Sequence, residues 1–202
     1  MVNVALMSTA QVRSFIAIEL PDEVRSGLRK LQGELKSPGD NFVKWVAPDG
    51  IHLTLKFMGN IPQQKVGQIV RILEQAVQGV SPFRLVVSGV GAFPNLGQPR
   101  VLWVGVSGEV DKLLTVQKCI DDGLVSLGFA KEMRPFTPHL TLARLREGAS
   151  SGDRGSFGEM VTRKSPKFNY EMVVDGVNLM RSQLLPSGAV YSRLAEVKLG
   201  QS

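Results

Sequence analysis

The sequence predicts an α+β fold of antiparallel sheets with helices packed on one face. Runs rich in β-branched and aromatic residues outnumber runs with helical spacing, and short turns join neighbouring strand-like runs. The composition agrees with this class, because 43% of the 202 residues are hydrophobic and 21% are charged. Such a chain can bury a sizeable core, which excludes a disordered, collagen-like or coiled-coil protein.

The first half of the chain is predicted to alternate strand and helix. A strand over residues 13–20 ends at Pro21, and apolar residues then recur at helical spacing as far as Leu35. Residues 42–46 and 51–58 are predicted to form two strands joined by a turn. A second helix and two further strands are predicted at about 62–79, 83–90 and 101–106.

The second half repeats this order. A helix is predicted over about 110–127, where Gly128 stops it, and a short strand follows at 138–144. Residues 147–166 are rich in Gly, Ser and charged residues, and they are predicted to form a long, mobile surface loop. The last two strands are predicted at about 172–180 and 190–199.

The charge balance and the scarcity of metal ligands limit the chemistry. The 24 Lys and Arg against 18 Asp and Glu give a net charge of +6, which favours an anionic partner such as RNA. A single cysteine cannot form an intramolecular disulfide, and two histidines are too few for a protein zinc site. We therefore expect chemistry without a metal or cofactor, in a reducing compartment.

The sequence also predicts a cytoplasmic protein without membrane contact. No stretch has the roughly 18 uninterrupted apolar residues that span a bilayer. The residues before Arg13 lack the basic region that opens a secretory signal. We expect the chain to act as a monomer.

One tetrapeptide occurs twice and contains both histidines of the chain. His52-Leu53-Thr54-Leu55 recurs as His139-Leu140-Thr141-Leu142, 139 − 52 = 87 residues later. Successive side chains of a strand alternate between faces, so each His and Thr share one face while the leucines point into the core. A gene duplication explains the repeated leucines and threonines. It gives no reason for histidine at both outward positions and nowhere else.

These residue types suit phosphoryl chemistry. An unperturbed histidine has a pKa of about 6.5 and can accept or donate a proton near neutrality, so two of them form an acid–base pair. Two threonine hydroxyls can donate hydrogen bonds to phosphate oxygens and stabilise the charge of a transition state. A pseudo-twofold axis between the two halves would let the strands face each other across a groove. The residues alone do not assign the acid and the base.

The two motifs and their flanking segments resemble a known family. The flanking segments that carry the likeness are 13–18, 45–46, 56–59, 91–94, 99–103, 134–138, 143–144 and 182–184. Together they resemble the RNA 2′,3′-cyclic phosphodiesterases, also called 2′-5′ RNA ligases, a branch of the two-histidine phosphoesterase superfamily. The likeness covers nearly the whole chain after the first dozen residues.

The resemblance implies an organisation and an activity. It implies a bilobed fold of two antiparallel sheets facing a central cleft, with helices on the outer faces. Residues 1–12 would be a flexible leader, and residues 13–199 a single bilobed catalytic domain with pseudo-twofold symmetry. The implied reaction is the metal-independent opening of an RNA-terminal 2′,3′-cyclic phosphate to a 2′-phosphate, with 2′-5′ RNA ligation as the reverse activity.

The resemblance also implies roles for individual residues. His139 would be the general base and His52 the general acid, while Thr54 and Thr141 would hold the phosphate oxygens. Arg144 falls where the family places a phosphate-binding arginine. Strict alternation from His139 puts Arg144 on the opposite face, so a bulge or the end of the strand must redirect it.

Further side chains are candidates for contacts with RNA. Lys56 is predicted to alternate onto the face of His52. The other basic candidates are Arg13, Arg100, Arg134 and Arg181. Five aromatic residues could include a platform for a base, although most strand aromatics belong to the core: Phe15, Trp45, Phe57, Phe93 and Trp103.

Two alternatives stay open at this stage. One is a binding module of the same fold that holds a nucleotide or an RNA end without turning it over. The other is a phosphodiesterase that acts on another small cyclic or 2′-5′-linked substrate. The net charge of +6 favours a polyanion over a small neutral ester.

Overall fold

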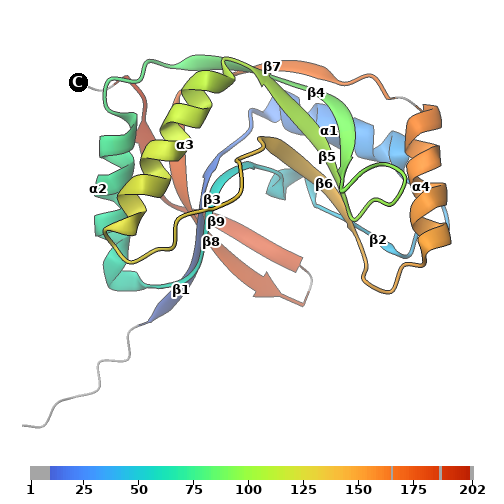
Figure 1. The fold of residues 1–202 in the computed structure, drawn as a ribbon, viewed down its shortest axis with the longest axis horizontal. Helices are drawn as coiled ribbons and strands as arrows, with labels where there is room; N and C mark the ends of the chain where they lie inside the picture. Colours follow the sequence, from blue (N-terminus) through green and yellow to red (C-terminus); the bar gives the residue numbers. More distant parts are fainter. Residues whose placement is uncertain (1–9, 165, 187, 201–202) are drawn as a thin grey trace, which may run out of the picture.

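The structure, a computed structural model, describes residues 10–164, 166–186 and 188–200. Over these residues the chain forms two antiparallel sheets and four α-helices (Figure 1). The predicted bilobed α+β class is confirmed. Among the described residues, none of the helices combines the length and apolar character that crossing a bilayer requires.

The first sheet has four strands and is covered by two helices. Its strand order is β3 (Leu53–Pro62), β1 (Gln11–Ile18), β8 (Gly176–Leu185) and β9 (Gly188–Lys198). The helices α2 (Val66–Val77) and α3 (Val110–Val125) pack side by side, with α2 against β9 and α3 against β3 (Figure 1). Their apolar faces bury Ile69, Leu73, Leu113 and Ile120 completely.

The second sheet has five strands and carries the other two helices. Its strand order is β2 (Val43–Trp45), β6 (His139–Leu145), β5 (Val101–Gly108), β4 (Phe83–Phe93) and β7 (Asn169–Val174). Helix α1 (Asp22–Leu35) approaches β7 closely, because a Cβ at Gly27 would lie 2.5 Å from the ring of Tyr170. The side-chain amide of Gln32 on α1 donates to the carbonyl oxygens of Val46 and Leu142 at 2.8 and 3.0 Å.

At two places the chain passes from one sheet to the other where the sequence predicts a strand pair or a single strand. The predicted pairing of strands 42–46 and 51–58 is wrong, because β2 joins the five-stranded sheet and β3 joins the four-stranded sheet. A short 3₁₀ turn, Pro48–Gly50, lies between them. The predicted strand over 172–180 is in fact the end of β7 and the start of β8, separated at Asp175. Neither crossing has a local sequence signal.

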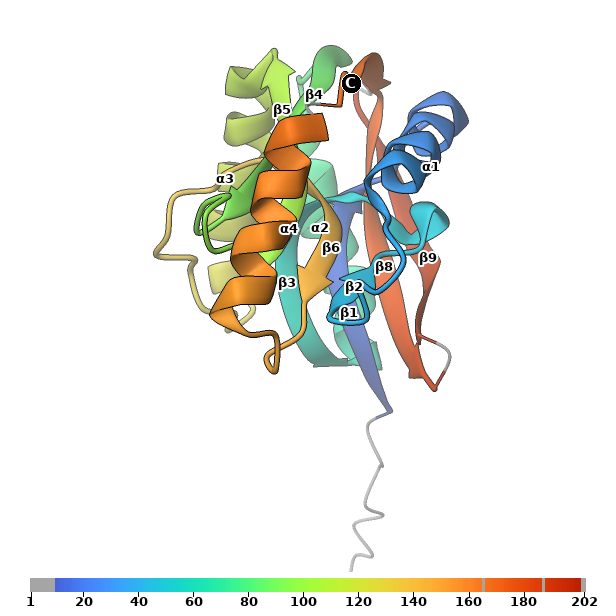
Figure 2. The same cartoon turned by 90° about the vertical axis from the view of Figure 1, so that its right-hand side faces the viewer.

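The predicted loop over residues 147–166 is also wrong, since most of it forms helix α4 (Ser151–Lys164). Phe157 and Val161, one helical turn apart, are 3% and 2% exposed. The ring of Phe157 meets that of Trp45 at 6.3 Å, so α4 packs against the edge of the five-stranded sheet. Tertiary packing thus overrides a composition that is typical of loops. Figure 2 shows α4 in front of this sheet.

The start of α4 has a local sequence signal at residues 150–153. The Ser150 hydroxyl accepts from the Asp153 N–H at 3.1 Å, and the Ser150 N–H donates to the Asp153 carboxylate at 2.9 Å. This reciprocal pair is a capping box, with Asp in the place of the usual Glu or Gln. Residues 1–9 of the predicted leader lie outside the described residues, and β1 already begins at Gln11.

Candidate active site

The two histidine motifs lie where the two sheets meet. Strands β3 and β6 contact each other, and they lie side by side in both Figure 1 and Figure 2. His52 immediately precedes β3, and His139 is the first residue of β6. Both histidines are half-buried, as are Thr54 and Thr141, whereas the leucines between them are buried as predicted. The fold therefore brings the two repeated motifs next to each other.

Each imidazole is oriented by a hydrogen bond of the same kind, to the backbone carbonyl of the residue two positions earlier. His52 Nδ1 lies 2.9 Å from the carbonyl oxygen of Gly50, and His139 Nδ1 lies 2.7 Å from that of Thr137. A carbonyl oxygen only accepts, so each Nδ1 carries the hydrogen and donates it. Nε2 of each ring can then accept a proton when the ring is neutral and donate one when it is charged. Each ring is thereby set for acid–base chemistry through Nε2.

Aromatic rings enclose His52. The ring of His52 stacks on that of Phe15 with centroids 4.4 Å apart, and Tyr191 meets it edge-on at 5.1 Å. Burial lowers the pKa of His52 below the usual value of about 6.5. The hydrogen bond to Gly50 and the negative charge of Glu19 oppose this effect. The neutral imidazole therefore predominates at pH 7 in the unliganded protein.

Aromatic residues of the five-stranded sheet surround His139. Phe93 meets its ring edge-on at 5.0 Å, and the ring of Trp103 lies at 6.5 Å. The indole of Trp103 packs over Gly91, where a Cβ would lie 2.2 Å from the ring, so only glycine fits beneath it. Phe93 and Trp103, two of the five aromatic candidates for a base platform, therefore lie beside His139.

A β-bulge brings Arg144 to the face of His139. The pairing of β5 with β6 shifts by one residue between Leu102 and Trp103. As a result His139, Thr141 and Arg144 pair with every second residue of β5, and they share one face of the sheet. Arg144 is exposed on this face. A guanidinium there is suited to bidentate binding of a phosphate.

The same irregularity occurs in β3. The pairing of β1 with β3 shifts between Ile16 and Ala17, so Thr54 and Phe57 pair with Ala17 and Phe15 on one face. The bulge follows the threonine in both copies of the motif. The residue five positions after each histidine is therefore directed to the same face as the threonine.

Phe57 thus has the place in the first copy that Arg144 has in the second. Its side chain is 67% exposed, and its ring lies 6.1 Å from Phe15, which in turn stacks on His52. An exposed aromatic ring is suited to stacking on a nucleobase. Among the five aromatic candidates, Phe57 is the one with a strongly exposed side chain.

The prediction that Lys56 shares the face of His52 is wrong. Because of the bulge, Lys56 pairs with the fully buried Ile16 and points to the side of the sheet that α3 covers. Its ammonium forms an ion pair with Asp121 and donates to the carbonyl oxygen of Ala130 at 2.7 Å. The Lys56 side chain is only 9% exposed, so it is not available to RNA.

Asp121 connects the two histidine motifs. One of its carboxylate oxygens binds Lys56, two residues after Thr54. The other accepts from the backbone N–H of Glu132 at 3.1 Å, in the segment that leads to His139. Asp121 lies in the C-terminal part of α3, and its role could not be recognised without the fold.

Two of the proposed RNA-binding arginines remain consistent with the site. Arg13 is exposed and shares a face of β1 with Phe15, because the two residues are two positions apart in the strand. Arg134 is exposed in the segment before β6, and its guanidinium lies 3.6 Å from the carboxylate of Glu132. Contact of either residue with RNA stays a prediction.

Two other arginines face away from the histidines. The backbone carbonyl of Arg100 accepts a hydrogen bond from the N–H of Leu145, so these two residues lie opposite each other. They are the next pair along the ladder after Val101 and Arg144. Alternation then directs Arg100 away from the face of Arg144. Arg181 pairs with the buried Ser14, one position away from the face of Phe15. Arg100 and Arg181 are thus poor candidates for contacts with the reacting phosphate.

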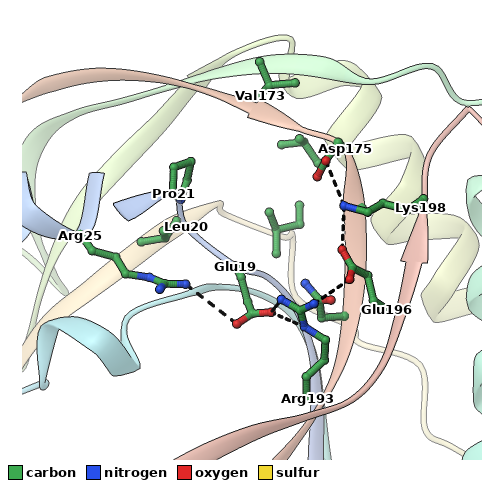
Figure 3. Close-up of a pocket in the computed structure, with 13 residues that line it drawn as sticks. Glu19, Leu20, Pro21, Arg25, Val173, Asp175, Arg193, Glu196 and Lys198 are labelled. Atoms are coloured by element: carbon green, nitrogen blue, oxygen red, sulfur yellow. Dashed lines mark hydrogen bonds and ion pairs between the residues drawn. The ribbon is translucent and has the colours of Figure 1, made fainter. Parts of the chain in front are cut away.

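Glu19, which acts on the pKa of His52, belongs to a network of ion pairs (Figure 3). Its carboxylate binds Arg193 at 2.6 Å and lies 3.9 Å from Arg25. The pairs continue from Arg193 to Glu196, Lys198 and Asp175. The network lines a cavity of about 250 Å³ that neither histidine lines. Its three cations and three anions neutralise one another, so the cavity is not a phosphate site.

Two imidazoles, each beside a threonine and each with an Nε2 that forms no hydrogen bond within the described residues, lie at the junction of the two sheets. This arrangement defines a two-histidine phosphoesterase. The family described as LigT-like phosphoesterase matches this chain twice, over residues 18–103 and again over residues 104–191. The chain therefore belongs to the family of LigT-like phosphoesterases, and it is an enzyme. Each match contains one histidine motif, which agrees with the internal repeat.

Relatives and solved structures agree with this assignment. The chain is 32% identical to an RNA 2′,3′-cyclic phosphodiesterase of Methanothermobacter thermautotrophicus, over 94% of this chain and 100% of the relative. A relative of the same description from Aquifex aeolicus is 30% identical over 94% of this chain and 98% of its own length. The crystal structure of TT0787 of Thermus thermophilus has a TM-score of 0.75 and 31% identity, and covers 93% of this chain and 97% of its own. The crystal structure of E. coli LigT complexed with 3′-AMP has a TM-score of 0.75 and 25% sequence identity, and it covers 95% of this chain and 100% of its own.

Proposed function

We propose that this enzyme hydrolyses RNA-terminal 2′,3′-cyclic phosphates to 2′-phosphates without a metal ion. The observation that carries the proposal is the matched pair of histidines, each of which donates from Nδ1 to a backbone carbonyl and, in the part of the chain that the structure describes, has no hydrogen-bond partner at Nε2. The relatives described as RNA 2′,3′-cyclic phosphodiesterases support the choice of substrate.

Each proposed step uses a side chain of the site. His139 Nε2 takes a proton from water as the water oxygen attacks phosphorus. The bond between phosphorus and O3′ breaks, and His52 Nε2 gives O3′ its proton. Thr54, Thr141 and Arg144 stabilise the charge on the non-bridging oxygens. The product carries a 2′-phosphate and a 3′-hydroxyl, and solvent returns the two imidazoles to their starting protonation states.

The same steps with another nucleophile join two RNA ends. If the 5′-hydroxyl of a second RNA replaces water, attack on phosphorus and loss of O3′ form a 2′-5′ phosphodiester. No additional energy source is needed, because the strained cyclic phosphate is the activated group. We therefore propose 2′-5′ ligation as a second activity at the same site.

The test uses a short RNA that ends in a 2′,3′-cyclic phosphate, incubated with the purified protein in the presence of EDTA. The expected product is a terminal 2′-phosphate. Tight binding without product would instead support a binding module of the same fold. Neither binding nor product would point to a small cyclic substrate.

Phe57 gives the first prediction for a variant. We expect Phe57→Ala to lower kcat/KM on the RNA cyclic phosphate about tenfold, because loss of a base–aromatic stack typically costs about 1–3 kcal/mol. Phe57→Tyr should retain most activity, since it keeps the ring. Steady-state kinetics of both variants measure this. An equal loss in the two variants would contradict stacking, and the high exposure of Phe57 makes a folding defect unexpected.

A further inference from the structure

A second cation lies beside Arg144 on the edge of the five-stranded sheet. Lys44 of the edge strand β2 pairs directly with Arg144 of β6. Paired residues of an antiparallel ladder point to the same face. Lys44 therefore shares the face of Arg144, Thr141 and His139, and it is exposed there.

The two cations repel each other. Their Cα atoms are about 4.5–5.5 Å apart, as in any directly opposed antiparallel pair. Within residues 10–164, 166–186 and 188–200, neither side chain forms an ion pair with an acidic group. Like charges placed directly opposite each other destabilise a sheet. A bound polyanion would remove this cost, because it supplies a phosphate to each cation.

The following inference rests on the proposed function and extends it to the choice of substrate. We infer that Lys44 binds the phosphate next to the cyclic one, so that the β2 edge selects RNA ends over mononucleotides. Arg144 shares one face of β6 with His139 and Thr141, so its guanidinium binds the cyclic phosphate. Lys44 is one strand farther out, where the adjoining phosphodiester of a polynucleotide can reach it. A cyclic mononucleotide has no second phosphate and gains nothing from Lys44.

A lysine on an edge strand has another common role. Charged side chains on an exposed edge prevent pairing with a second copy of the sheet. That role affects solubility and leaves the relative rates on long and short substrates unchanged. The ratio of the two rates therefore separates the two explanations.

The experiment compares kcat/KM for a pentanucleotide RNA ending in a 2′,3′-cyclic phosphate with kcat/KM for adenosine 2′,3′-cyclic phosphate. We expect Lys44→Ala to lower the pentanucleotide-to-mononucleotide ratio about fivefold, and Lys44→Arg to preserve it. The salt dependence of the pentanucleotide reaction should become less steep, by about 0.7 in the slope of log kcat/KM against log salt. Lys30→Ala is the matched control, because Lys30 is an exposed lysine of α1 and its removal gives the same net charge.

The outcomes separate this inference from the proposed function. If the wild type hydrolyses both substrates and Lys44→Ala leaves the ratio and the salt slope unchanged, the inference about Lys44 is wrong and the proposed function stands. If Lys30→Ala lowers the ratio as much as Lys44→Ala, the effect is one of net charge, and the inference is again wrong. If the wild type hydrolyses neither substrate, the proposed function itself fails.

Discussion

Replacing His52 or His139 by alanine is expected to lower the rate of cyclic phosphate opening by roughly 10²–10⁴-fold, the range for a positioned general acid or base. In both rings Nδ1 is engaged with a backbone carbonyl and Nε2 is left for the proposed chemistry, so each variant would remove one of the two proposed proton transfers. Because the two act in one reaction, the double variant should be only slightly slower than the slower single variant. Single-turnover rates at saturating enzyme measure the chemical step directly.

The controls for this prediction concern folding. His52 packs between Phe15 and Tyr191, so His52→Ala leaves space beside two rings. His52→Gln fills more of that space, and it should be as inactive as His52→Ala while unfolding at nearly the wild-type denaturant concentration. A folded variant of either histidine with near-normal turnover would disprove the paired mechanism.

The pKa of His52 gives a prediction about substrate binding. Burial keeps this pKa below that of an unperturbed histidine, so the free enzyme holds His52 neutral at pH 7. A general acid must be protonated when it acts. The negative charge of a bound phosphate favours the imidazolium, and we therefore expect adenosine 2′-monophosphate to raise the pKa of His52.

Proton NMR of the two histidine Cε1–H signals measures this shift. The chain has two histidines, so a His139→Gln variant identifies the signal of His52. The titration of the free protein should place the His52 pKa below the usual histidine value, and the complex should move it upward. A pKa that stays constant or falls in the complex would argue against His52 as the acid.

The proposed catalytic residues could be predicted from the sequence because they repeat. Both histidines and both threonines occur in two copies of one tetrapeptide, and the period of a strand directs them to one face. The direction of the residues that follow could not be predicted. A bulge after Thr54 and another after Thr141 shift the alternation of the strands by one residue. As a result Phe57 and Arg144 lie on the face of the threonines, and Lys56 lies on the opposite face. Alternation alone gave the wrong face for Lys56.

Contacts between distant segments explain the other differences. Tyr191 reaches His52 from the last strand, and Glu19 acts on it from the end of β1. No local pattern predicts either contact. Helix α4 replaces the predicted loop because Phe157 is buried by aromatic residues of a segment more than a hundred residues earlier in the chain. The capping box of Ser150 and Asp153 is a local sequence signal for the start of this helix.

The ion pair of Lys56 and Asp121 should be important both for stability and for turnover. The two side chains are 9% and 7% exposed, and Lys56→Met leaves the carboxylate of Asp121 buried without its cation. We expect this change to lower the free energy of unfolding by about 3–5 kcal/mol. That is a large part of the 5–15 kcal/mol by which domains are usually stable. Chemical denaturation of the variant measures the loss.

A double variant separates stability from positioning. Lys56→Met combined with Asp121→Leu removes both charges, and a buried ion pair replaced by apolar side chains usually leaves a protein about as stable as before. The double variant also loses the hydrogen bonds to Ala130 and Glu132, which hold the segment before His139. A displacement of about 1 Å in a reacting group can cost about 10²-fold in rate, so we expect recovered stability with kcat still roughly tenfold to a hundredfold low. Wild-type kcat in a stable double variant would show that the pair supports the fold alone, because the position of His139 would then not depend on Asp121.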